Sequence, residues 1–190
     1  LVMSLLQYRL QRCGFNVVRF SYPTVRCSLK DNAALLQKFV LSLDAERLHF
    51  VAHSLGGLLL RQFFHDYPQQ RPGRVVTLGT PHGGSEAARR MGRYSVGKVL
   101  LGQSYENGLR GDVPGWDGKR EMAVIAGKLS LRLFSFVGRL PEPNDGTVTV
   151  AETLLPTAGE HIVLPVTHLG LLISPRVADR ICRFLGQAHA

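Results

Sequence analysis

The sequence has no long apolar run, few cysteines and fewer acidic than basic residues. No apolar stretch among its 190 residues approaches the roughly 18 residues that a membrane-spanning helix needs, so no transmembrane segment is expected. The three cysteines, Cys13, Cys27 and Cys182, lack C-x-x-C spacing, which argues against both a disulfide scaffold and a structural zinc site. We therefore expect a reducing, cytoplasmic location. The chain opens at Leu1 inside a helical pattern, which indicates that residues precede it, and the sequence does not decide whether a signal peptide is among them.

The basic residues are dispersed rather than clustered. Lys and Arg number 23 against 14 Asp and Glu, a net charge of +9. They occur singly or in pairs such as Arg89 and Arg90, without a basic block or interleaved aromatic residues. The charge therefore indicates a solvated basic surface, and no nucleic-acid partner is expected.

Strand-like and helix-like patterns alternate along the chain. Short apolar runs indicate buried strands, and apolar residues at helical spacing indicate helices. The expected strands cover residues 16–20, 48–52, 75–78, 122–126 and 161–164. The expected helices cover residues 2–13, 29–43, 55–67 and 175–185. Such alternation predicts an α/β fold in which helices cover both faces of a mostly parallel sheet, as a single domain over residues 1–190.

A candidate nucleophile lies between an expected strand and an expected helix. Ser54 stands in the run Ala52-His53-Ser54-Leu55-Gly56-Gly57. A serine at a tight strand-to-helix turn is held in a strained conformation and needs small neighbours two residues away on each side, which Ala52 and Gly56 supply. The alternative is a capping serine in a glycine-rich turn.

A serine hydroxyl needs a base, which a carboxylate usually orients. His168 follows the last expected strand, at the end of a parallel sheet where such folds place their chemistry. Asp145 stands in a turn before that strand, and it competes for the role with Asp112, Asp117 and Glu142. The predicted catalytic residues are therefore Ser54, Asp145 and His168, in that chain order.

These segments, together with Leu78-Gly79-Thr80-Pro81-His82-Gly83-Gly84-Ser85, resemble small bacterial lipase-like and esterase-like members of the α/β-hydrolase superfamily. The resemblance implies cleavage of small-molecule or lipid acyl esters through an acyl-enzyme intermediate, with neither a cofactor nor a metal. It also implies an oxyanion hole of two backbone N–H groups. Leu55 can supply one, whereas the loop that usually supplies the other has no counterpart in the sequence, as if the N-terminal strand and that loop were missing.

The irregular stretch of residues 83–119 is a candidate cap over the site, or an ordinary surface loop. Trp116 within it could form part of an apolar substrate wall. His53 is expected to line the pocket or pack beside it, and His82 to structure its loop or face the substrate. Two other functions stay open: an acyltransferase or thioesterase with the same machinery, and a catalytically silent binding module.

Overall fold

The computed structural model describes residues 2–23, 27–85, 112–130 and 140–187. Its centre is a four-stranded sheet in the order β1-β2-β3-β4. These strands are β1 (Phe50–His53), β2 (Val75–Leu78), β3 (Met122–Gly127) and β4 (Glu160–Leu164). All three pairings are parallel, so every strand ends at the same edge of the sheet. The predicted α/β architecture is confirmed.

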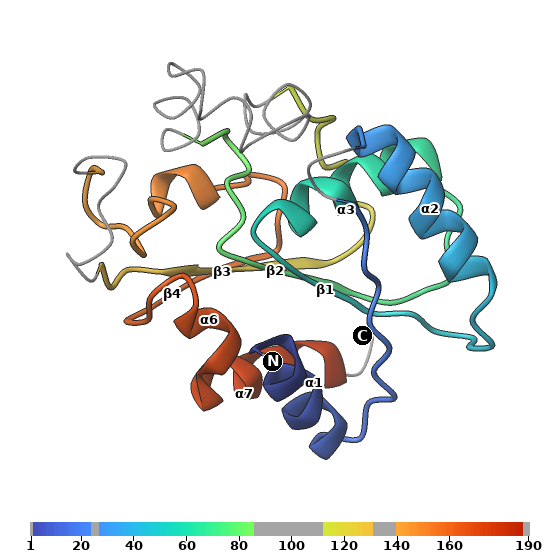
Figure 1. The fold of residues 1–190 in the computed structure, drawn as a ribbon, viewed down its shortest axis with the longest axis horizontal. Helices are drawn as coiled ribbons and strands as arrows, with labels where there is room; N and C mark the ends of the chain where they lie inside the picture. Colours follow the sequence, from blue (N-terminus) through green and yellow to red (C-terminus); the bar gives the residue numbers. More distant parts are fainter. Residues whose placement is uncertain (1, 24–26, 86–111, 131–139, 188–190) are drawn as a thin grey trace.

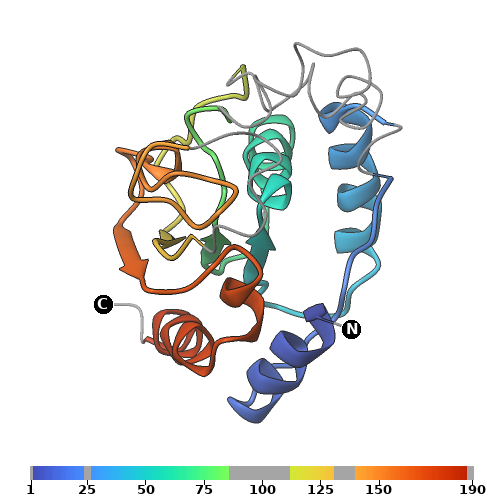
Figure 2. The ribbon, with the colours of Figure 1, turned by 60° about the vertical axis from the view of Figure 1, so that its left-hand side comes forward.

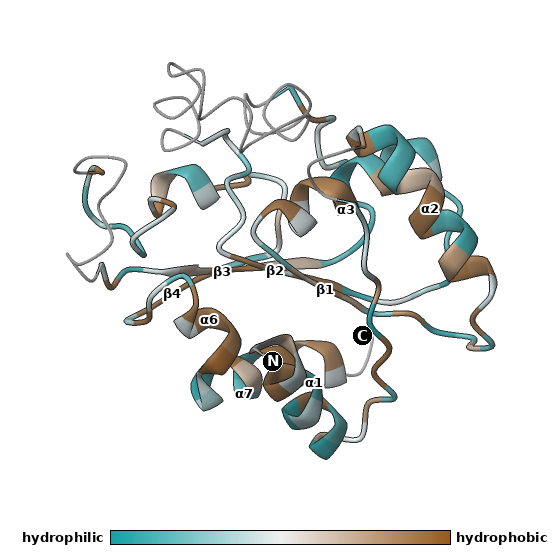
Figure 3. Cartoon of the chain, viewed as in Figure 1, coloured by the Kyte–Doolittle hydropathy of each residue, from teal (hydrophilic) through white to brown (hydrophobic). Residues whose placement is uncertain are grey.

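Helices cover both faces of the sheet (Figures 1 and 2). One layer holds α2 (Leu29–Leu41) and α3 (Leu55–Asp66), and the other holds α1 (Val2–Arg12), α6 (Gly170–Ile173) and α7 (Pro175–Gly186). Alternate strand residues point to opposite layers: Val75 packs with α2 and α3, whereas Val76 and Leu78 pack with α1 and α7. Apolar colour accordingly runs along the strands in Figure 3.

Local sequence signals set the ends of two helices. At the start of α2, the amide of Asp31 donates to Ser28 Oγ at 3.1 Å, and the Ser28 amide donates to the Asp31 carboxylate at 3.3 Å. Ser28 and Asp31 thus form a reciprocal capping box, which satisfies backbone N–H groups that have no partner within the helix. The final helix begins at Pro175, where a residue without an N–H leaves no helical bond unmade.

The expected strand at residues 16–20 is wrong. These residues connect α1 to α2 without joining the sheet, and Val18 is 52% exposed. A strand needs a hydrogen-bonded neighbour, and no other strand in the described part of the chain pairs with this segment. It is attached instead by side chains of α1, since Gln7 donates to the Val17 carbonyl at 3.0 Å.

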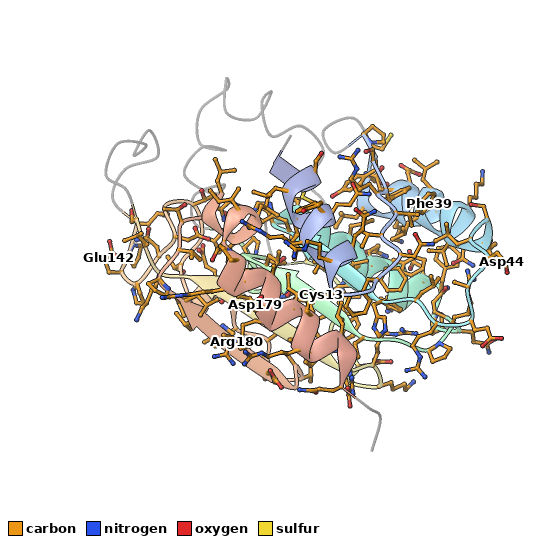
Figure 4. All side chains as sticks on the ribbon, turned by 90° about the horizontal axis from the view of Figure 1, so that it is seen from below. Cys13, Phe39, Asp44, Glu142, Asp179 and Arg180 are labelled. Atoms are coloured by element: carbon orange, nitrogen blue, oxygen red, sulfur yellow. A yellow bond between two sulfur atoms is a disulfide. The ribbon has the colours of Figure 1, made fainter. Side chains whose placement is uncertain are left out.

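The cysteine interpretation also needs correction, because Cys13 and Cys182 form a disulfide. The bond ties the end of α1 to α7, and Figure 4 shows Cys13 beside that helix. Cys27 is the free thiol. Spacing along the chain could not reveal this pair, because the two residues are 169 positions apart. The scarcity of cysteine therefore no longer supports a reducing compartment. No helix in the described ranges has the length and hydropathy to cross a membrane.

Candidate active site

Ser54 occupies a sharp corner between β1 and α3. Its backbone has φ 54° and ψ −125°, and it is the only residue other than glycine with positive φ in the described ranges. Such a conformation costs on the order of 1–3 kcal/mol and persists only when the surroundings enforce it. Two contacts enforce it here: the Ser54 amide donates to the Leu78 carbonyl at 2.8 Å, and Thr80 Oγ1 donates to the Ser54 carbonyl at 2.8 Å.

The glycines after Ser54 make room for this corner. A Cβ on Gly56 would lie 3.3 Å from the Ala52 Cβ, which explains why both positions hold small residues. A Cβ on Gly57 would lie 2.2 Å from Thr80 Oγ1, which is closer than any real contact allows. Gly57 therefore permits Thr80 to reach the Ser54 carbonyl. The sequence around Ser54 gives no sign of this role of Thr80, because Thr80 follows a different strand, β2.

Asp145 and His168 form a hydrogen-bonded pair in which the carboxylate is buried. His168 Nδ1 lies 2.8 Å from Asp145 Oδ2, with 13% and 1% of the two side chains exposed. The His168 amide also donates to the Asp145 carbonyl at 2.9 Å. The other carboxylate oxygen accepts the amides of Thr147 and Val148, at 2.9 and 2.7 Å. A buried carboxylate needs such partners, and here they leave Asp145 Oδ2 directed at the imidazole.

Glycines at two strand ends create the space for this pair. Gly79 follows β2 with φ +55°, and a Cβ there would lie 3.0 Å from His168 Nδ1 and 3.1 Å from Asp145 Oδ2. Gly127 ends β3, and a Cβ there would lie 2.8 Å from the Asp145 Cβ. Since Gly79 directly follows Leu78, whose carbonyl accepts the Ser54 amide, the pair sits at the sheet edge from which Ser54 emerges. The glycines at the carboxyl ends of β2 and β3 are the signal that could have identified these positions.

The imidazole of His53, the last residue of β1, lies against that of His168. His53 Nε2 is 3.0 Å from the His168 carbonyl oxygen, and the ring centroids are 4.5 Å apart. Burial is the main reason that the pKa of His53 falls to about 4, and the nearby His168 lowers it further. His53 is therefore a neutral ring beside the Asp145–His168 pair.

His82 and Trp116, the other two residues expected near the substrate, both lie in buried positions. His82 is only 4% exposed, its Nε2 lies 3.1 Å from Thr77 Oγ1, and burial lowers its pKa to about 3. Trp116 is 5% exposed and packs edge-on against Phe64 near the end of α3, whereas Ser54 precedes that helix. Trp116 also borders a small cavity of about 150 Å³ with Phe64 and Arg120. The side chains of His and Trp are both partly apolar, and here both are buried.

Arg61 of α3 connects the residue before the irregular stretch to two residues in its later part. It donates to the carbonyls of His82, Val113 and Pro114 at 2.7, 3.1 and 2.9 Å. The middle of the expected cap, residues 86–111, lies outside the described residues, so the cap over residues 83–119 stays a prediction.

The described residues contain no group of three or more His, Cys, Asp or Glu placed to hold a metal ion. At one edge of the parallel sheet lie a strained serine, a hydrogen-bonded imidazole and a buried carboxylate, which are groups that acid–base chemistry can use.

Comparisons with known proteins agree with this architecture. A family described as "alpha/beta hydrolase fold" matches residues 3–133, more than half of the chain. A search of curated proteins by sequence finds no match.

Solved structures of low sequence identity share the fold. The phospholipase PlaB from Legionella pneumophila superposes with a TM-score of 0.72 at 15% identity, over 98% of this chain and 54% of that one. The mature lipase BlEst2 from Bacillus licheniformis has a TM-score of 0.63 at 19% identity, over 86% and 76% of the two chains. Tomato methylketone synthase I has a TM-score of 0.63 at 11% identity, over 97% and 91%. At such identities the likeness concerns the fold, and with the family match it leads to one conclusion: the chain belongs to the α/β-hydrolase fold family.

Proposed function

We propose that this chain is a serine hydrolase of carboxylic esters, in which Ser54 is the nucleophile, His168 the general base and Asp145 the orienting carboxylate. The observation that carries the proposal is the 2.8 Å contact between His168 Nδ1 and Asp145 Oδ2, at the sheet edge where strained Ser54 leaves β1. The lipase and the phospholipase among the structural relatives support the same reaction class.

The contact with Asp145 determines how His168 would act. A carboxylate only accepts hydrogen bonds, so Nδ1 carries the proton and Nε2 keeps a free lone pair. That lone pair takes the proton of the Ser54 hydroxyl as its oxygen attacks the ester carbonyl. Asp145 then stabilises the imidazolium that forms.

The negative charge of the tetrahedral intermediate develops next to the start of α3. Leu55 is the first residue of that helix, where backbone N–H groups have no helical partner and the helix dipole favours an anion. We assign the Leu55 N–H as one oxyanion donor. His168 next protonates the departing alcohol, which leaves the acyl group on Ser54. Water attacks this ester with His168 again as base, and the acid and free serine are regenerated.

The proposed substrates are acyl esters of small molecules or lipids. The phospholipase and lipase among the relatives point to lipid esters, which we would compare with short esters. The same machinery would serve an acyltransferase or a thioesterase, and partitioning of the acyl group between water and an added alcohol separates transfer from hydrolysis.

Labelling by a fluorophosphonate tests the nucleophile directly. We expect one label per chain, located on Ser54 by peptide mass spectrometry, and none in Ser54→Ala. Ser174→Ala is a matched control, because the Ser174 side chain makes no capping bond to its helix. Equal labelling of Ser54→Ala would show that the nucleophile is wrongly assigned.

Turnover measurements test whether His168 is the base and whether the chain is instead a catalytically silent binding module. Hydrolysis of p-nitrophenyl butyrate by His168→Gln should fall by about 10³-fold or more, since the base would be gone. A wild-type protein that neither hydrolyses esters nor reacts with the phosphonate would support a silent binding module instead.

A further inference from the structure

The contact between His53 and His168 joins residues 115 positions apart in the chain. His53 is the last residue of β1 and directly precedes Ser54. His168 lies on the loop that follows β4, at the opposite side of the sheet order. This contact therefore links β1, which leads into the candidate nucleophile Ser54, directly to His168, the residue proposed as its base.

The chemistry of the contact gives the hydrogen bond a direction. Because burial lowers the pKa of His53 to about 4, its ring is neutral at pH 7 and carries one N–H. The His168 carbonyl can only accept, so the proton lies on His53 Nε2, 3.0 Å from that oxygen. His53 therefore donates, and Nδ1 is its unprotonated nitrogen.

With this bond, three groups of His168 are held by hydrogen bonds. The amide of that residue is held by the Asp145 carbonyl, its Nδ1 by the Asp145 carboxylate, and its carbonyl by His53. Two of the three bonds come from the Asp145 loop, and only the third comes from β1. Without it, the imidazole stays attached to Asp145 while the strand with Ser54 loses its polar link to the loop.

A neutral ring also suits this place electrostatically. His168 becomes positively charged when it accepts the serine proton, and the two ring centroids are 4.5 Å apart. A protonated His53 would repel that charge, whereas the neutral ring does not. An aliphatic side chain would fill the same space without repulsion, but it could not hold the carbonyl.

We propose that His53 is a positioning residue, which holds the His168 loop against the nucleophile strand through its Nε2–H bond to the His168 carbonyl. This inference rests on the proposed function for its catalytic consequence, while the structural link can be measured without any turnover. It assigns His53 a role in alignment rather than in substrate contact.

Two substitutions of His53 distinguish the effect of its hydrogen bond from the effect of its aromatic ring. His53→Phe keeps an aromatic ring and removes the donor, and His53→Gln keeps an N–H donor of similar reach and removes the ring. Should the Phe variant fail to fold, His53→Leu makes the same comparison. His161→Gln is the matched control, because His161 likewise contacts a neighbour through Nε2, at 2.8 Å from Thr153 Oγ1, outside the candidate site.

The kinetic readout is kcat and KM for p-nitrophenyl butyrate. In the Phe variant we expect kcat to fall by about 10- to 100-fold with KM changed less than about two-fold, since small misplacements of catalytic groups have effects of this size. In the Gln variant we expect kcat within about three-fold of the wild type. Equal kcat in the Phe variant and the wild type, or equal losses in both variants, would overturn the proposal.

The readout without turnover is the low-field proton resonance of His168 Nδ1–H, identified by its loss in His168→Gln. It should broaden or vanish in His53→Phe and persist in His53→Gln and His161→Gln. If the wild-type chain shows the resonance but hydrolyses no ester, the proposed hydrolase activity is refuted. The resonance still tests the link between His53 and His168. A sharp resonance in His53→Phe would refute the link itself.

Discussion

Opening the disulfide between Cys13 and Cys182 is expected to destabilise the whole domain. The bond joins residues 169 positions apart and so encloses every strand of the sheet. The chain-entropy relation gives about 5 kcal/mol at 25 °C for a loop of that length, and natural and engineered bridges typically contribute about 2–4 kcal/mol. We therefore expect Cys13→Ser with Cys182→Ser to lower the free energy of unfolding by about 2–5 kcal/mol.

Urea unfolding followed by circular dichroism measures this loss. With a slope of about 2 kcal/mol per molar urea, the midpoint should fall by about 1–2.5 M. The helices themselves should persist before the transition, because α1 packs on α7 through apolar residues such as Leu10 and Ile181. Cys27→Ser is the matched control and should leave the midpoint unchanged, since that thiol is free.

Two results would refute this reasoning. One is an unchanged midpoint after reduction. The other is the reaction of all three cysteines with a thiol reagent in unfolded, unreduced protein, where Cys27 alone should react.

Three further predictions concern the buried polar framework. Gly79→Ala should abolish the low-field resonance of His168, because its Cβ would lie 3.0 Å from that imidazole and its φ of +55° strains any side chain; a retained resonance would contradict this packing. Arg61→Leu leaves three carbonyls without their donor and should lower the free energy of unfolding by about 2–4 kcal/mol in urea, and an unchanged midpoint would show that water replaces the side chain. Burial lowers the pKa of His82 from 6.5 to about 3 and that of His53 from 6.5 to about 4. As the pH drops from about 6.5 toward 4, the unfolded chain therefore takes up protons before the folded chain does, and the free energy of unfolding should fall. His82→Asn should flatten that decline in urea titrations at several pH values, and an identical slope would exclude His82 as its source.

Features that depend on neighbouring residues could be predicted from the sequence. The small residues around Ser54 mark a tight corner, and the corner is present with positive φ. The alternation of strands and helices indicates a parallel sheet, which places the ends of all strands at one edge. That edge is why Asp145, assigned from the turn before the last expected strand, and His168, assigned from the loop after it, prove to be hydrogen-bonded partners.

Features that depend on distant partners could not be predicted. Residues 16–20 have the composition of a buried strand, but pairing needs a neighbouring backbone, which composition does not describe. The disulfide and the contact of His53 with His168 are made by residues more than a hundred positions apart. The need for glycine at position 79 likewise arises from side chains of other loops.

The strand order has a consequence for the timing of synthesis. Because β1 to β4 lie side by side in chain order, Ser54 leaves the ribosome with β1 and His168 only after β4. A nascent polypeptide that stops short of residue 160 would hold the serine with no imidazole donated by the later loop. On stalled chains of increasing length, we expect Ser54 to react with a phosphonate only once the chain includes β4 and His168. The reaction would therefore report when the sheet is complete.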